Sequence, residues 1–188
     1  MRCRLPLLMF LSCLFSCALS AQESSRWCVS TNAADWAYLL TVNAGGQYAV
    51  SRHFTLETQA RWNPWSFSNA DNDVFQSRQR TFSVGGRWWP WYTYSGWWIG
   101  ARGQYQEYSS GGLSSSATEE GDALGVVLAG GYSVQITRWL NVDLGVGVWG
   151  GHSRYTAYAC PHCGRVTDSG EKAFFLPDEM LVSAMFIF

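Results

Sequence analysis

The most compact group of chemically active side chains in the sequence is Cys160-Pro161-His162-Cys163-Gly164. Two cysteines at this spacing form half of a zinc knuckle, but a structural zinc site needs four ligands and normally a second pair. The sequence offers no second pair, so we predict no metal site and no cofactor. Because the N-terminus indicates export, we expect Cys160 and Cys163 to form a local disulfide. The alternatives are two free thiols, or a metal site completed by His162 or by a second chain.

His152 and Ser153 are the residue pair that would suggest a hydrolase. Adjacent residues of a strand point to opposite faces of the sheet, whereas a general base must lie within hydrogen-bond reach of its nucleophile. Only a local bulge would bring the two side chains together. We therefore predict no catalytic residues, and we keep a small lipid-modifying enzyme of the outer membrane as an alternative.

Six charged residues share one face of the predicted strands. They are Glu57, Arg61, Arg87, Arg102, Asp143 and Glu179. In a closed barrel this face points inward, so three positive and three negative groups would meet in the lumen. Buried charges persist only when they are paired and hydrogen-bonded. We predict a charge network that fills the lumen; the alternative is a selectivity filter or proton path in a narrow pore.

The elements that must position these charges are strands, because apolar and polar residues alternate with a period of two. The alternating segments are 40–50, 54–63, 81–89, 97–106, 123–136, 140–149 and 179–188, and residues 27–34 supply a short first strand that turns near Asp35. Short turns at 51–53, 92–95 and 137–139 alternate with long, polar or glycine-rich loops at 67–78, 109–121 and 159–170. Together they predict eight antiparallel strands.

Two observations favour a barrel over a soluble sandwich of two sheets. Small residues crowd the polar face, as a narrow interior requires, and lysine is almost absent from the strands, with Lys172 the single one in the chain. The fold prediction is therefore all-β: an eight-stranded antiparallel transmembrane β-barrel of the outer membrane, with short periplasmic turns and longer extracellular loops. Eight strands leave room for side chains but not for an open channel.

Aromatic residues gather near both predicted rims of the barrel, where tyrosine and tryptophan favour the membrane interface. Near the short turns they are Phe54, Trp91, Tyr92, Tyr94, Trp97, Trp139 and Phe188. Near the long loops they are Trp62, Trp65, Phe67, Tyr105, Tyr108, Tyr155 and Tyr158. The alternative is that these rings belong to an ordinary core.

The N-terminus has the organisation of a secretory signal peptide. Arg2 and Arg4 precede an apolar run over 5–19, and small residues follow it. We predict a signal peptide over 1–21. A membrane anchor helix and a lipoprotein signal at Cys17 are the alternatives.

The rest of the chain, residues 22–188, is predicted to form a single β-barrel domain. Its last strand ends on Phe186-Ile187-Phe188. In an outer-membrane barrel the final aromatic lies in the interfacial girdle. We expect Phe186 and Phe188 to serve membrane assembly through the barrel-assembly machinery.

Composition excludes two other classes of protein. The formal net charge is -1, and it becomes -3 without Arg2 and Arg4, so no nucleic-acid partner is expected. After Ala21 no apolar run is long enough for a transmembrane helix. The chain has 11 tryptophans and 19 glycines, which suits alternating strands.

The chain resembles an uncharacterised family of exported bacterial barrels, domain of unknown function 3575. The segments that carry the resemblance are 29–36 (VSTNAADW), 61–65 (RWNPW), 87–91 (RWWPW), 95–98 (SGWW), 104–108 (QYQEY), 119–122 (EEGD) and 160–165 (CPHCGR). They span nearly the whole mature chain. The resemblance implies an outer-membrane β-barrel of Bacteroidetes type, and it supplies no activity and no functional residues.

The function that we expect is non-catalytic. A monomeric barrel with a filled lumen would act in envelope structure, or would present its loops to a surface partner such as a fimbrial appendage or a host molecule. Its other expected partners are outer-membrane lipid and the barrel-assembly machinery. A lipid-modifying enzyme and a narrow pore are the alternative functions.

Overall fold

The computed structural model describes residues 26–68, 74–111, 118–159 and 165–188, without the side chains of 66–68, 74–76, 178 and 179. Four predictions fall outside the described residues: the signal peptide, the disulfide between Cys160 and Cys163, and the positions of the Phe67 and Glu179 side chains.

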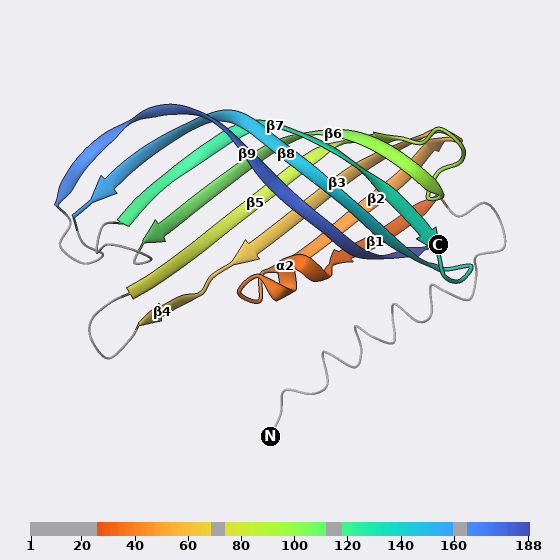
Figure 1. Cartoon of the computed structure of the whole chain (residues 1–188), viewed down its shortest axis with the longest axis horizontal. Coiled ribbons are helices and arrows are strands. Elements are labelled where there is room, and N and C mark those ends of the chain that lie inside the picture. Colours follow the sequence, from red (N-terminus) through yellow and green to blue (C-terminus); the bar gives the residue numbers. More distant parts are fainter. Residues whose placement is uncertain (1–25, 69–73, 112–117, 160–164) are drawn as a thin grey trace, which may run out of the picture.

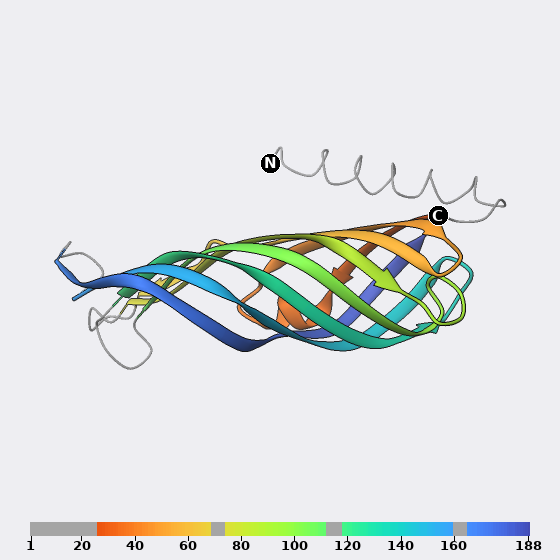
Figure 2. The same ribbon diagram turned by 90° about the horizontal axis from the view of Figure 1, so that it is seen from above.

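Eight antiparallel strands form a closed barrel, which confirms the all-β class and the strand number of the predicted fold (Figures 1 and 2). The strands of the wall are β1 (Trp27–Asn32), β2 (Val42–Ser51), β3 (Phe54–Asn63), β5 (Val74–Trp88), β6 (Gly96–Gly111), β7 (Thr118–Gln135), β8 (Leu140–Tyr158) and β9 (Val166–Ile187). Each strand pairs with its neighbours along the chain, and β1 pairs with β9 to close the ring. A short strand, β4 (Ser66–Ser68), pairs with the start of β5.

The last residue of the chain takes part in the closure. The Phe188 N–H donates to the Trp27 carbonyl at 2.8 Å, and the Trp27 N–H donates to the Phe188 carbonyl at 3.3 Å. Phe186 stacks on Trp139, with 6.0 Å between ring centroids. Both predicted assembly residues therefore lie at the seam between the first and last strands.

The pairing register shows how strongly the strands tilt. A row of paired residues that starts at Val29 on β1 passes through each strand in turn and reaches Phe175 on β9. Val29 itself pairs with Phe186, which lies 11 residues further along β9. A stagger of this size in a small barrel corresponds to strands tilted by about 40° from the barrel axis.

The two ends of the barrel differ. At one end the connections are short, at 52–53, 89–95 and 136–139, and Trp27 and Phe188 lie there; we call it the short-turn end. At the other end β5 to β9 project well beyond β1 to β3, and we call it the hairpin end (Figure 1).

The projecting strands replace part of the predicted long loops. The loop predictions were wrong where β5 begins at Val74, β6 continues to Gly111, β7 begins at Thr118 and β9 begins at Val166. β8 continues beyond its predicted strand to Tyr158, up to the start of the predicted loop. These extensions lack apolar alternation, which is why the sequence pattern missed them. Polar pairs across the strands connect them instead, such as Arg154 with Glu171 at 2.8 Å and Ser109 with Glu120 at 2.9 Å.

A five-residue helix, α2 (Ala33–Ala37), stands where the sequence predicted the end of the first strand and a turn. Asn32 caps it, because its side-chain oxygen accepts from the Ala34 N–H at 3.2 Å. Leu39 and Leu40 then have φ values of 51° and 53°, a left-handed conformation that ends the helix and delays β2 to Val42. Among the described residues no helix is long and apolar enough to cross a membrane.

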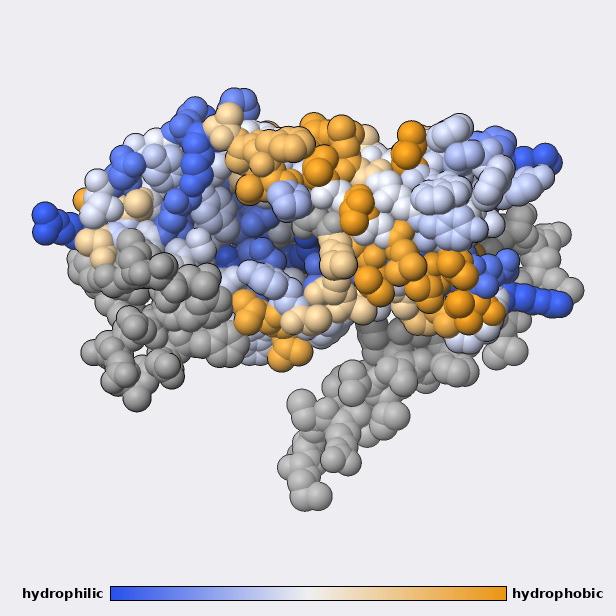
Figure 3. Space-filling model, in the orientation of Figure 1, coloured by the Kyte–Doolittle hydropathy of each residue, from blue (hydrophilic) through white to orange (hydrophobic). Residues whose placement is uncertain are grey.

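The outward face of the barrel is apolar at mid-height. Figure 3 shows hydrophobic residues gathered over the middle of the molecule and hydrophilic ones toward both ends. About half or more of each of these side chains is exposed: Leu56, Val84, Ile99, Val126, Leu128, Leu144 and Val146. We call this set the apolar belt.

Most of the rings predicted at the short-turn rim are exposed there, including Trp91, Trp97 and Trp139. The prediction was wrong for Tyr94, which is only 5% exposed. Its φ of 66° lies in the left-handed region, and its ring packs edge-on against buried Trp89 inside the barrel. The sequence gives no signal for this local backbone conformation.

Candidate functional site

Packed side chains close the lumen near the short-turn end. The buried cluster there consists of Cys28, Trp89, Tyr94, Trp98, Leu181 and Met185. The ring centroids of Trp89 and Trp98 lie 6.3 Å apart, and neither residue is more than 1% exposed. Gly131 leaves room for the Trp98 ring, since a Cβ atom on Gly131 would lie 2.7 Å from Cζ2 of that ring. In the sequence, Trp89 and Trp98 alternate in step with the inward residues Arg87 and Arg102, but the pattern does not predict that they seal the lumen.

On the hairpin side of this cluster, Arg87 connects two carboxylates. Its Nε atom donates to Glu57, and its Nη1 atom lies 2.5 Å from Oδ2 of Asp143. Trp98 donates its indole N–H to the other Asp143 oxygen at 2.6 Å, and the guanidinium lies 3.9 Å from the Trp98 ring centroid. These side chains are almost fully buried. The arginine is therefore held by charge, by hydrogen bonds and by a cation–π contact at once.

Two further arginines extend the charged interior. Arg102 lies 3.6 Å from Glu57 and donates to Gln59 at 3.2 Å. Arg61 lies nearer the hairpin end, with its Nε atom 3.9 Å from Oδ2 of Asp35 on α2. The structure thus joins four of the six predicted charges, and it pairs Arg61 with a carboxylate that the sequence had assigned to a turn.

The lumen leaves little free space beside the buried charges. Next to Glu57, Arg87 and Arg102 lies a cavity of about 10 Å³. That is room for about one water molecule. Together with the buried cluster at the short-turn end, the packed charges close this part of the described barrel.

His152 and Ser153 lie on opposite faces of β8. Ser153 is 3% exposed and its hydroxyl lies 2.9 Å from that of Tyr108 inside the barrel, while His152 is exposed outside. The register shifts between β8 and β9 fall elsewhere, at Gly147–Val148 and Ala157–Tyr158. No bulge brings the histidine to the serine.

Lys172, Glu119 and Tyr108 connect three strands on the inner face of the hairpin end. Lys172 lies 2.5 Å from Glu119, and the Tyr108 hydroxyl donates to the same carboxylate oxygen at 2.8 Å. Partial burial opposes ionisation of Glu119. The hydrogen bonds from Lys172 and Tyr108 and the charge of Lys172 outweigh it, so the pKa of Glu119 lies below its ordinary value.

We expect Lys172→Met to raise the pKa of Glu119, as an NMR titration of its carboxyl carbon would show. A carboxyl with a lowered folded-state pKa stabilises the fold fully above its unfolded pKa, and that stability is lost as the pH falls through the folded pKa. Because the variant narrows the gap between the folded and unfolded pKa values of Glu119, this carboxyl should contribute less stability at neutral pH than in the parent. Arg154→Met removes a different exposed pair and should leave the titration unchanged. An unaltered Glu119 titration in Lys172→Met would contradict the assignment.

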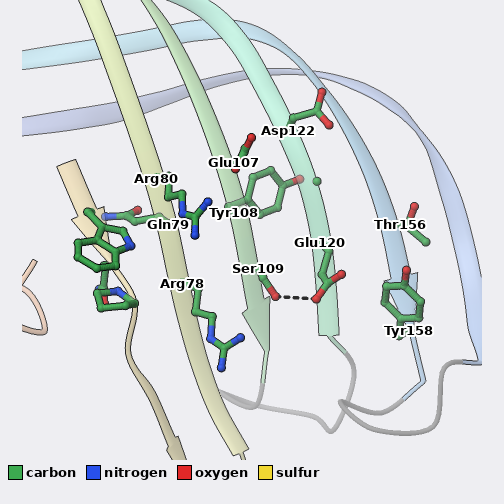
Figure 4. Close-up of a pocket in the computed structure, with 14 residues that line it drawn as sticks. Arg78, Gln79, Arg80, Glu107, Tyr108, Ser109, Glu120, Asp122, Thr156 and Tyr158 are labelled. Atoms are coloured by element: carbon green, nitrogen blue, oxygen red, sulfur yellow. Dashed lines mark hydrogen bonds between the residues drawn. The ribbon is translucent and has the colours of Figure 1, made fainter. Parts of the chain in front are cut away.

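An open pocket of about 580 Å³ lies at the hairpin end and is lined from β3, β5, β6, β7 and β8. Figure 4 shows Arg78 and Arg80 reaching from β5 toward β6, and the hydrogen bond from Ser109 to Glu120. Glu107 on β6 is the register partner of Arg80, so a carboxylate and an arginine lie side by side at the pocket. A mixed charge of this kind suits a polar partner and not a polyanion.

The described residues hold no group of three or more His, Cys, Asp or Glu side chains placed to bind a metal ion. Within the same part of the chain the buried Cys28 is a free thiol.

The fold and its interior define a class of protein: a closed eight-stranded β-barrel whose lumen is packed with charged and aromatic side chains. The family model described as "Protein of unknown function (DUF3575)" matches residues 7–188, and the chain belongs to that family. The resemblance noted from the sequence is thereby confirmed. No curated protein and no solved structure matches the chain.

Proposed function

We propose that this protein is an integral outer-membrane β-barrel with no catalytic role. It would anchor the hairpin end at the cell surface, either to support the envelope or to bind a partner there. The observation that carries the proposal is the apolar belt, because a water-soluble barrel would expose polar side chains at mid-height instead.

The height of the belt fits a membrane. Along β7 the outward residues from Val134 to Leu124 are uncharged. Ten residues span about 33 Å along a strand. At the tilt of about 40° this becomes roughly 25 Å, the height of the apolar band of outer-membrane barrels.

Charges begin abruptly where the belt ends. Five outward residues lie in one register row across the wall: Arg80, Glu107, Asp122, Arg154 and Glu171. Charged side chains prefer the headgroup region and water to hydrocarbon. This row therefore supports a boundary between lipid and water on the hairpin side.

The packed lumen supports a role outside the barrel. Since packed side chains close the described lumen near the short-turn end, the surface left for a partner is the hairpin end with its open pocket. Recording in planar bilayers should show no conductance from the purified monomer. A stable conductance would favour the narrow pore instead.

We expect Leu144→Arg to destabilise the barrel in lipid vesicles by about 2–4 kcal/mol, because it places a charge in the hydrocarbon layer. Leu144 is 46% exposed on the outward face. Urea titration of the refolded protein, with heat-modifiable gel migration as the readout of folding, measures the loss. Thr156→Arg, beyond the belt on the same strand, is the matched control and should change the stability little. Equal stability of the two variants would contradict the membrane location.

A further inference from the structure

The barrel wall is incomplete on one side. β1 ends at Asn32, which pairs with Ser183, whereas β9 continues toward the hairpin end as far as Val166. The Asn32 side chain donates to the Met180 carbonyl at 3.3 Å and accepts from the Val182 N–H at 3.0 Å. Among the described residues no strand pairs with the free edge of β9 beyond this point. In place of a strand, α2 lies beside β9 and β2.

Exposed apolar side chains lie on both sides of this gap. Leu40 is 63% exposed beside α2, and Met180 and Leu176 on β9 are 72% and 52% exposed. Figure 3 shows a hollow between β9 and α2, with hydrophilic residues at its floor and hydrophobic ones around it.

Behind β9 the inner wall is apolar as well. Trp149 packs edge-on against Phe174, with 4.5 Å between ring centroids, and Val127 completes the cluster from β7. Leu176 lies directly opposite Trp149 on β9, so it extends the cluster to the gap. Trp149 is 6% exposed, and its indole N–H has no hydrogen-bond partner among the described residues.

The wall of the lumen that faces this apolar cluster is polar. Arg61 and Asn63 on β3 are buried there and point inward, as Asp35 does from α2. The upper lumen thus has an apolar wall next to the gap and a polar wall across from it. A space of this kind suits an amphiphile that enters sideways.

We propose that the gap between β9 and α2 is a lateral portal, through which the acyl chain of a membrane phospholipid enters and lies along Leu176, Phe174 and Trp149. The proposal rests on the membrane location proposed above. Burial of methylene groups against the inner apolar wall supplies the driving force. The headgroup stays at the mouth of the portal, where polar groups are near.

The test uses the mature protein refolded in vesicles of a phospholipid that carries a photoactivatable diazirine at the end of one acyl chain. After illumination, mass spectrometry locates the lipid adducts. We expect adducts on inward Trp149 and Phe174 in addition to outward Val126 and Ile99. Leu176→Asp should reduce the inward adducts to background and leave the outward ones unchanged, and Leu176→Met should preserve both.

Each outcome supports or overturns one of the two proposals. Outward adducts without inward ones in the parent protein would overturn the portal and leave the membrane location standing, as would inward adducts that persist in Leu176→Asp. The first of these results is also the one expected if a partner strand covers the edge of β9. No adducts on either face would overturn the membrane location itself. Heat-modifiable migration verifies folding, and Leu176→Asn replaces the aspartate variant if that fails to fold.

Discussion

Replacing Arg87 with alanine should lower the free energy of unfolding by about 3–5 kcal/mol, the usual cost of removing one partner from a buried ion pair. The reason is that Glu57 and Asp143 would remain buried without the cation that both contact. Trp98 would also lose the guanidinium above its ring. Denaturant unfolding of the barrel in vesicles measures the change.

Arg154→Ala is the matched control for this prediction. Arg154 also contacts a carboxylate, Glu171, at 2.8 Å, but both side chains are mostly exposed. Exposed pairs contribute about 0–1 kcal/mol, so this variant should stay close to the parent. Combining Arg87→Met with Asp143→Asn should recover part of the loss, since it removes one uncompensated carboxylate and leaves Glu57 beside Arg102. Equal losses for Arg87→Ala and Arg154→Ala would show that the lumen network does not stabilise the barrel.

Deleting Phe188 should strongly reduce the amount of assembled barrel in the membrane. The deletion removes both backbone hydrogen bonds between this residue and Trp27, which end the seam between β9 and β1. It also removes the terminal aromatic that we expect the assembly machinery to recognise. The heat-modifiable fraction in membranes of expressing cells measures the effect.

Two substitutions separate the ring from the backbone. Phe188→Tyr keeps an aromatic and should assemble normally. Phe188→Ala keeps the hydrogen bonds to Trp27 and removes only the ring, so reduced assembly of this variant would assign the role to the aromatic. Normal membrane levels of the deletion variant would contradict an assembly role for the terminal residue.

Alternation alone was enough to predict which face of each strand points inward. It placed Glu57, Arg87, Arg102 and Asp143 together, because the polar face of every strand in a closed barrel points into the same lumen. It also separated His152 from Ser153, since neighbouring residues of a regular strand cannot share a face.

The sequence could not predict how far the strands extend or what fills the lumen between them. Periodicity assigns a face but gives no height, so the partnership of Arg61 with Asp35 depends on α2 folding back over the wall. Left-handed Leu39 and Tyr94 have no sequence signature either, because leucine and tyrosine rarely adopt that backbone conformation. The gap beside β9 exists because β1 ends at Asn32, and periodicity does not predict where a strand ends.

The central claim concerns the two faces of each strand. The residues of the apolar face contact lipid, and the residues of the polar face point into a packed interior. Nitroxide labels placed one at a time along β7, from Ala123 to Leu128, test it most directly through collision rates with oxygen and with a water-soluble nickel complex. In vesicles we predict oxygen accessibility that peaks at Leu124, Val126 and Leu128, with low accessibility to both reagents at the residues between them. High nickel accessibility at the three outward positions would contradict the account.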